Sequence, residues 1–181
     1  MMRRELPQPR KKQSRVEQAA WSLIQQLSIG GPPLDVHELA SKLGVRITKS
    51  DLGDDCSGVL VKSGDSAVIG INWEHHSNRQ RFTIAHELGH FFLHKNGTYV
   101  DRSTSAFFRN SESGSGTLKE EREANQFATA LLMPSKWIYR EIGNNNLNLD
   151  DDLAVMDLAE RFEVSEQAMS FRLANLKLTT L

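Results

Sequence analysis

The residues His86-Glu87-Leu88-Gly89-His90 are the most informative part of this chain. If they are helical, the two histidines lie one turn apart and point to the same side, with Glu87 beside them. This pattern is typical of a site in which two imidazoles hold a Zn²⁺ ion while the carboxylate stays unligated and acts as a general base. It predicts hydrolysis, and a peptide bond is the expected substrate.

The segment around this motif has the composition of a buried helix. We predict a helix over residues 78–94, and apolar side chains occur on nearly every side of it. They are Phe82, Ile84, Ala85, Leu88, Phe91, Phe92 and Leu93. A helix that is apolar almost all round is expected to be covered on most of its faces.

Two histidines do not complete a hydrolytic zinc site, which takes three protein ligands and leaves the fourth position to water. His94, one turn past His90, is a candidate by its spacing. However, three ligands along one helix spread over about 12 Å, which is too far for one ion. We therefore expect His94 to be bonded within the fold and the third ligand to come from another segment.

A helix predicted over residues 119–133 is the better source. Its core-facing stripe consists of Ala124, Phe127, Ala128 and Leu131. At 100° per residue, Glu121 lies about 60° from Ala124 towards the stripe, whereas Glu123 lies about 100° the other way. We choose Glu121, and Glu120 and Glu123 remain alternatives, although both fit a charged helix start equally well. Asn125, one turn past Glu121, could accept a hydrogen bond from the far ring nitrogen of a ligating histidine.

The remaining chain predicts an α+β fold in which a small sheet is flanked by helices, with the buried motif helix in a zincin-like arrangement. Residues 1–15 are basic and interrupted by proline, so we expect a disordered tail followed by a single domain over residues 16–181. The expected helices are 16–27, 36–43, 152–162 and 165–176, the strands are 45–48, 58–61 and 67–71, and a polar loop covers 95–117. The strand 58–61 could be an ordinary sheet strand or could pair with an extended substrate.

Composition excludes some classes of protein. The 22 Lys and Arg nearly balance the 23 Asp and Glu, so no overall field favours nucleic acid. Cys56 is the only cysteine, which fits a reducing cytoplasm. We expect neither a secretory signal nor a membrane span, because no apolar run is long enough.

The two C-terminal helices, about residues 150–178, superficially resemble a DNA-binding helix-turn-helix. The second of them offers only Arg172 and Lys177 as cations, which is too few for the phosphate contacts that groove binding needs. We therefore expect a structural helical pair packed on the rest of the domain, and direct binding of nucleic acid is not expected.

A family resemblance covers about residues 16–178. Residues 81–94, 121–128 and 131–134 resemble the ImmA/IrrE family of metallopeptidases, and residues 34–45 and 158–173 resemble its flanking helices. The resemblance implies a gluzincin-type zinc endopeptidase that acts in bacteria on a helix-turn-helix repressor and frees genes of a mobile element or a stress response. The gluzincin pattern has an aspartate four residues after the ligand glutamate, whereas this chain has Asn125, whose amide polarises its histidine less.

The expected site therefore has Glu87 as the catalytic base and His86, His90 and Glu121 as metal ligands. The expected metal is Zn²⁺, although such a ligand set would also take Mn²⁺ or another divalent ion. One alternative is a metal-containing antirepressor that binds the repressor without hydrolysis. Another is a DNA-binding regulator whose metal is structural.

Overall fold

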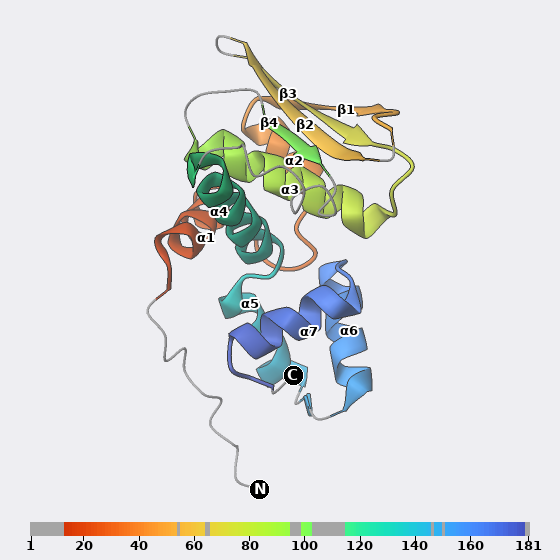
Figure 1. Cartoon of the computed structure of the whole chain (residues 1–181). Coiled ribbons are helices and arrows are strands. Elements are labelled where there is room, and N and C mark those ends of the chain that lie inside the picture. The colour runs from red at the N-terminus through yellow and green to blue at the C-terminus, as the bar shows by residue number, and fades with distance from the viewer. Residues whose placement is uncertain are drawn as a thin grey trace, which may run out of the picture.

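The computed structural model describes residues 13–53, 55–63, 66–94, 99–102, 115–145, 147–149 and 151–179, with the backbone alone at 99–102 and 115–117. Most of the predicted tail lies outside these residues. Ser14 and Arg15, however, belong to the folded part, because Ser14 caps the helix that begins at Arg15. The fold is α+β, as predicted, with a small sheet at one end and helices beneath it (Figure 1).

The strands within this part of the chain form one four-stranded sheet. They are β1 (Val45–Ser50), β2 (Cys56–Ser63), β3 (Ser66–Asn72) and β4 (Tyr99–Arg102), in the order β1-β3-β2-β4. β1 runs parallel to β3, and β2 is antiparallel to both of its neighbours. The idea that residues 58–61 pair with a substrate is wrong, because Gly58 to Leu60 already pair with β3 on one side and β4 on the other.

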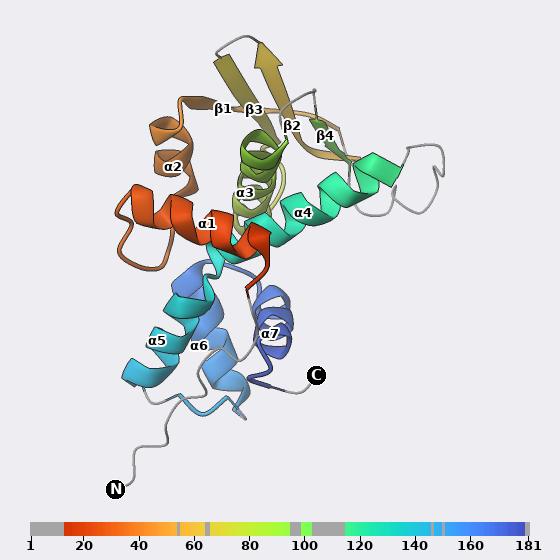
Figure 2. The same ribbon diagram turned by 90° about the vertical axis from the view of Figure 1, so that its left-hand side faces the viewer.

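The helices are α1 (Arg15–Gln26), α2 (Val36–Lys42), α3 (Ser77–Leu93), α4 (Ser115–Leu132), α5 (Ser135–Asn145), α6 (Asp152–Phe162) and α7 (Glu166–Asn175). Figure 2 shows α3 beneath the sheet, with α1 and α4 crossing below it and α5, α6 and α7 grouped at the opposite end. Within the described ranges, no helix is long and apolar enough to cross a membrane.

Local sequence explains several of these boundaries. The Asp35 carboxylate accepts hydrogen bonds from the His37 and Glu38 amides and so starts α2. The chain leaves α2 through Gly44, whose φ of +73° is readily adopted by glycine. Ser165 caps α7 by accepting a hydrogen bond from the Ala168 amide. Because these signals are local, α2 and α7 begin and end within about one residue of their predicted bounds.

Two elements, β4 and α5, were not predicted, and α4 is longer than predicted. β4 lies inside the predicted polar loop, and α4 begins at Ser115, four residues before its predicted start at 119. The rest of that loop, residues 95–98 and 103–114, lies outside the described part. α5 follows Pro134 directly and buries Trp137, Ile138 and Ile142.

The motif helix α3 is buried, as predicted. Every residue from Thr83 to His90 is inaccessible to solvent or nearly so. On the sheet side it lies under the core side chains of Leu60, Ile69 and Ile71, and on the other side it packs on α4. The motif therefore lies between the sheet and α4.

The C-terminal pair α6 and α7 is a structural unit packed on the core. Arg172 is 7% exposed, its Nε donates to the Met133 carbonyl at 3.0 Å, and it pairs with Glu17 at 2.7 Å. Arg81 in α3 pairs with Glu163, between α6 and α7, at 2.9 Å. Arg172 would enter a DNA groove if this pair bound DNA. Instead it connects α7 to α1 and to the segment that follows α4.

Candidate metal centre

The close approach of α3 and α4 depends on Gly89. A β-carbon at this position would lie 3.0 Å from the Ala124 α-carbon, 3.2 Å from the Ala124 carbonyl oxygen and 3.3 Å from the Phe127 β-carbon. The neighbouring atoms belong largely to the α4 backbone, so a side chain could not be accommodated without moving that helix. Gly89 thus lets α4 bring its first turns beside His86 and His90.

Three ligand atoms converge between the two helices. The Nε2 atoms of His86 and His90 are 3.0 Å apart. The Glu121 carboxylate places one oxygen 3.2 Å from His86 Nε2 and the other 3.3 Å from His90 Nε2. The structure therefore brings together the three residues chosen from the sequence, and neither Glu120 nor Glu123 belongs to this group.

These separations fit an ion with tetrahedral coordination. With bonds of about 2.0–2.1 Å, two ligand atoms on a tetrahedral Zn²⁺ are about 3.3–3.4 Å apart, close to the spacings seen here. The donor set is two imidazole nitrogens and one carboxylate, a combination that hydrolytic zinc sites use. Among the described residues the group has three members, which leaves a fourth position for water.

Protonation in the site suits a divalent cation. Burial would raise the pKa of Glu121, but hydrogen bonds from His86 and His90 outweigh it and hold the pKa down to about 2. Burial lowers the pKa of His90 below its ordinary value of 6.5, because the charged imidazolium is poorly solvated there, and Glu121 opposes this shift only in part. At neutral pH Glu121 is ionised and His90 is neutral, as metal binding requires.

Asn125 orients the first histidine. The Nδ1–H of His86 donates to Asn125 Oδ1 at 3.1 Å. This bond fixes the ring so that Nε2 faces Glu121 and His90. The structure thus shows the contact that the Glu121-to-Asn125 spacing predicts.

Glu87 lies against Gly58 of the sheet. It is 0% exposed, and a β-carbon at Gly58 would lie 3.3 Å from its Oε1 and overlap the Thr83 side chain. Gly58 therefore leaves the space that the Glu87 and Thr83 side chains occupy. No residue of β2 other than glycine could lie this close to α3 at that point.

His94 is not one of the metal-binding group, as predicted. It is 7% exposed, its Nδ1 lies 3.1 Å from His90 Nδ1, and its Nε2 lies 3.2 Å from Glu123 Oε2. Sequence reasoning missed this role of Glu123, which it assigned to a charged helix face. The available signal was that Glu123 and Glu121 lie on either side of the buried stripe.

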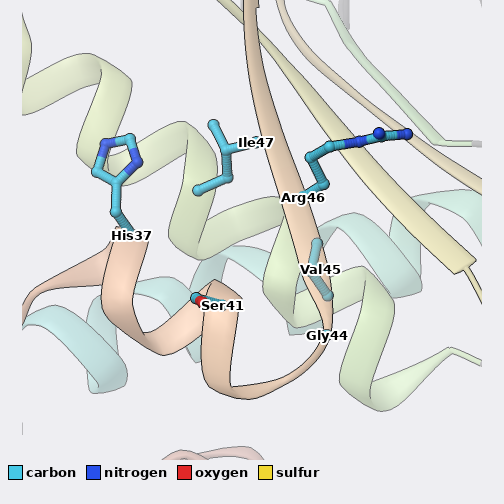
Figure 3. Close-up of a pocket in the computed structure, with 6 residues that line it drawn as sticks. All are labelled: His37, Ser41, Gly44, Val45, Arg46 and Ile47. Atoms are coloured by element: carbon cyan, nitrogen blue, oxygen red, sulfur yellow. The ribbon is translucent and has the colours of Figure 1, made fainter.

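A separate hollow lies away from this site. A shallow pocket of about 420 Å³ lies between α2 and β1 and is lined by His37, Ser41, Gly44, Val45, Arg46 and Ile47. Figure 3 shows Ile47 turned towards His37 and Arg46 on the other side of the strand. None of the metal-binding group lines this pocket, so the two sites are distinct.

Comparisons with known proteins agree with the fold and the site. Residues 40–174 match the peptidase family M78, described as the IrrE N-terminal-like domain. The chain is 29% identical over 145 residues to Metallopeptidase ImmA of Bacillus subtilis (strain 168), covering 78% of this chain and 76% of that protein. A Mycobacterium tuberculosis transcriptional regulator of known structure is similar with a TM-score of 0.59 and 21% identity.

The cluster of two histidines and one glutamate, together with the family match, indicates a metallopeptidase domain. Because the family match spans most of its length, the chain belongs to peptidase family M78, the ImmA/IrrE metallopeptidases, which confirms the resemblance found in the sequence. The similarity to the mycobacterial regulator covers 88% of this chain but 46% of that protein, and it shows a shared fold alone.

Proposed function

We propose that this chain is a zinc-dependent endopeptidase of gluzincin type that cleaves a helix-turn-helix transcriptional repressor in a bacterial cytoplasm. Cleavage would relieve repression of a mobile element or a stress response. The observation that carries the proposal is the convergence of His86, His90 and Glu121 at tetrahedral spacing, with Glu87 on the same helix. Membership of a metallopeptidase family supports it.

The residues divide the chemistry between them. His86, His90 and Glu121 would hold the ion, which supplies Lewis acidity to activate water and polarise a carbonyl. The Glu87 carboxylate takes one proton from the attacking water as its oxygen bonds to the carbonyl carbon. It then gives that proton to the amine nitrogen as the carbon–nitrogen bond breaks. The buried position of Glu87 against Gly58 keeps the carboxylate in place for both transfers.

The contacts of the C-terminal helices do not favour DNA as the partner of this chain. Arg172, one of the two cations at the presumed recognition helix, is engaged with Met133 and Glu17. Without such cations, a helix cannot make the phosphate contacts that hold it in a groove. This disfavours the DNA-binding alternative.

The test uses the purified chain and a repressor encoded beside its gene. With zinc present, we expect two repressor fragments whose masses sum to the intact protein plus one water. A chelator should stop fragment formation and added zinc should restore it. An intact repressor under all conditions would refute the peptidase. If that intact repressor nevertheless left its operator DNA, the antirepressor alternative would replace the present proposal.

A further inference from the structure

The two metal-binding histidines have different supports on their far ring nitrogens. His86 donates to Asn125, a neutral amide. His90 Nδ1 faces another histidine, His94, whose second nitrogen faces the Glu123 carboxylate. Behind His86, Asn125 stands where the gluzincin pattern has a carboxylate. Behind His90 there is a carboxylate, that of Glu123, which is reached through His94.

The direction of hydrogen bonding along this chain of groups follows from its two ends. When His90 Nε2 binds the metal, the proton of its ring is on Nδ1, which donates to His94 Nδ1. Glu123 is an acceptor only, so His94 must carry its proton on Nε2 and donate to the carboxylate. His94 is then an acceptor at Nδ1, which is what His90 requires. Each group fixes the tautomer of the next.

The backbone around His94 is also fixed by hydrogen bonds, which come from Lys62. Lys62 in β2 donates to the His94 carbonyl at 2.6 Å and reaches the His90 and Phe91 carbonyls at 3.3 and 3.4 Å. These carbonyls lie in the last turn and at the C-cap of α3, where the His90 carbonyl also accepts from the His94 amide. Lys62 thereby closes the helix at the residue that supports His90.

Glu123 is anchored on the other helix. It lies two residues after Glu121 on α4, and the Lys119 ammonium, on the previous turn, is 3.7 Å from its second oxygen. α4 therefore contributes Glu121 to the metal-binding group and Glu123 to the support of His90. Figure 2 shows α4 crossing beneath α3, the arrangement that lets one helix do both.

We propose that His94 and Glu123 are positioning residues that orient His90 for metal binding through a His90–His94–Glu123 hydrogen-bond relay. The inference rests on the metal centre of the proposed function, but not on peptide cleavage. Hydrogen-bonded groups behind a ligand commonly change metal affinity 10- to 100-fold when removed. We expect a loss of about that size from breaking the relay at His94.

The experiment measures the dissociation constants for Zn²⁺ and Co²⁺ by competition with a coloured chelator, using four variants. His94→Phe keeps a ring of similar size but removes the acceptor, so it should bind both metals about 10- to 100-fold more weakly. His94→Asn restores an acceptor near the Nδ1 position and should recover most of that loss. Glu123→Gln should weaken binding to a smaller extent, because an amide can also donate and no longer enforces one tautomer of His94.

Glu120→Gln is the matched control for Glu123→Gln. It removes the same charge from the same helix turn but from outside the metal-binding group and the relay. Unchanged affinity in this variant would show that the effect of Glu123→Gln comes from its hydrogen bond rather than from net charge. An equal loss in both variants would overturn the role of Glu123.

Two further readouts separate orientation from simple loss of structure. The visible spectrum of the Co²⁺ protein should change in His94→Phe and return towards wild type in His94→Asn. In the zinc-bound wild type, long-range proton–nitrogen correlation spectra should show the His94 proton on Nε2. Wild-type affinity in His94→Phe, or the proton on Nδ1, would overturn the inference alone. A wild-type chain that binds no metal would overturn the proposed function with it.

Discussion

Glu87 and the histidines on either side of it have different neighbours, although they are adjacent in sequence. His86 and His90 face α4, whereas Glu87 lies against Gly58 of the sheet. This separation follows from helix geometry, because residue i+1 projects about 100° away from residue i. Glu87 is therefore outside the metal-binding group although it is adjacent to His86 in the sequence.

Replacing Glu87 by glutamine should separate metal binding from catalysis. The amide has nearly the same shape but cannot take a proton from water, so Glu87→Gln should bind zinc like wild type. Its rate of repressor cleavage should fall by about 10²- to 10⁴-fold, the usual contribution of a general base. Zinc content by elemental analysis and fragment formation on gels check both points. Persistent cleavage by this variant would refute the assignment of the base.

The stability of the metal-free protein should depend on pH in a predictable direction. The pKa of His90 is lowered in the folded chain, so the unfolded chain takes up this proton first as the pH falls. That contribution to stability is fully present above 6.5 and is lost as the pH falls through the lowered pKa. Glu121, with a pKa of about 2 against 4.5, has the same sign in a lower window, from 4.5 towards 2.

We therefore expect the urea midpoint, measured with chelator present, to decrease steadily as the solution is acidified below pH 6.5. A His90→Phe variant lacks the first of these groups and should show a shallower decrease just below that pH. A wild-type midpoint that rose on acidification from neutrality would contradict the assigned direction.

At the scale of elements, the site depends on how closely α3 and α4 approach. Gly89 faces the α4 backbone at 3.0 Å from where a β-carbon would be. Glu121 lies one turn before Ala124, the residue at that contact, so any outward shift of α4 would carry the carboxylate away from the histidines.

Gly89→Ala should therefore weaken both the fold and the metal site. Alanine favours a helix by about 1 kcal/mol over glycine, so helix propensity alone would stabilise the variant. Overpacking against a neighbouring backbone costs about 1–3 kcal/mol, and we expect this effect to dominate. Urea unfolding and zinc titration should both show losses.

The control is Gly30→Ala, where a β-carbon would have no atom within 4 Å. It should change stability by less than about 0.5 kcal/mol. A Gly89→Ala variant that was more stable than wild type and bound zinc equally well would contradict the packing argument.

Some elements could be predicted from the sequence because their signals are local. The Asp35 cap, the Gly44 turn and the apolar face of α3 all act within a few residues of where they occur. α5 is harder to predict, because Pro134 both follows the end of α4 and directly precedes the start of α5. β4 was missed because an edge strand of four residues in a polar segment depends on its partner β2 and carries little pattern of its own.

The metal-binding group could also be predicted from local patterns, whereas the hydrogen bonds behind His90 could not. Helical angles favoured Glu121, and its spacing from Asn125 suggested the contact with His86. The relay through His94 to Glu123 could not be predicted, because it depends on how two separate helices cross. That crossing is set by the small side chains at Gly89 and Ala124 together, which no single-helix pattern reveals.

At the scale of the whole molecule, two arginines connect the C-terminal helices to the rest of the domain. Arg81 of α3 bonds to the Leu34 carbonyl and to Glu163, while Arg172 of α7 bonds to Met133 and Glu17. The residues that they join are far apart in the sequence. The helical pair therefore stabilises the domain.

Arg172→Met should destabilise the protein without affecting any binding of DNA. Methionine keeps much of the volume but leaves Glu17 and the Met133 carbonyl without their cation, a loss of about 2 kcal/mol for a partly buried pair. Lys177→Gln, at the exposed cation beyond the end of α7, should change stability by less than about 0.5 kcal/mol. Urea unfolding checks both, and equal small effects would contradict the role given to Arg172.

The most direct test of the metal centre is diffraction from zinc-soaked crystals on either side of the zinc absorption edge. We predict one anomalous peak about 2.0–2.2 Å from His86 Nε2, His90 Nε2 and a Glu121 carboxylate oxygen. The Glu87 carboxylate should lie beside this peak without coordinating it. A peak bound by other residues, or Glu121 turned to solvent with no peak between α3 and α4, would contradict the account.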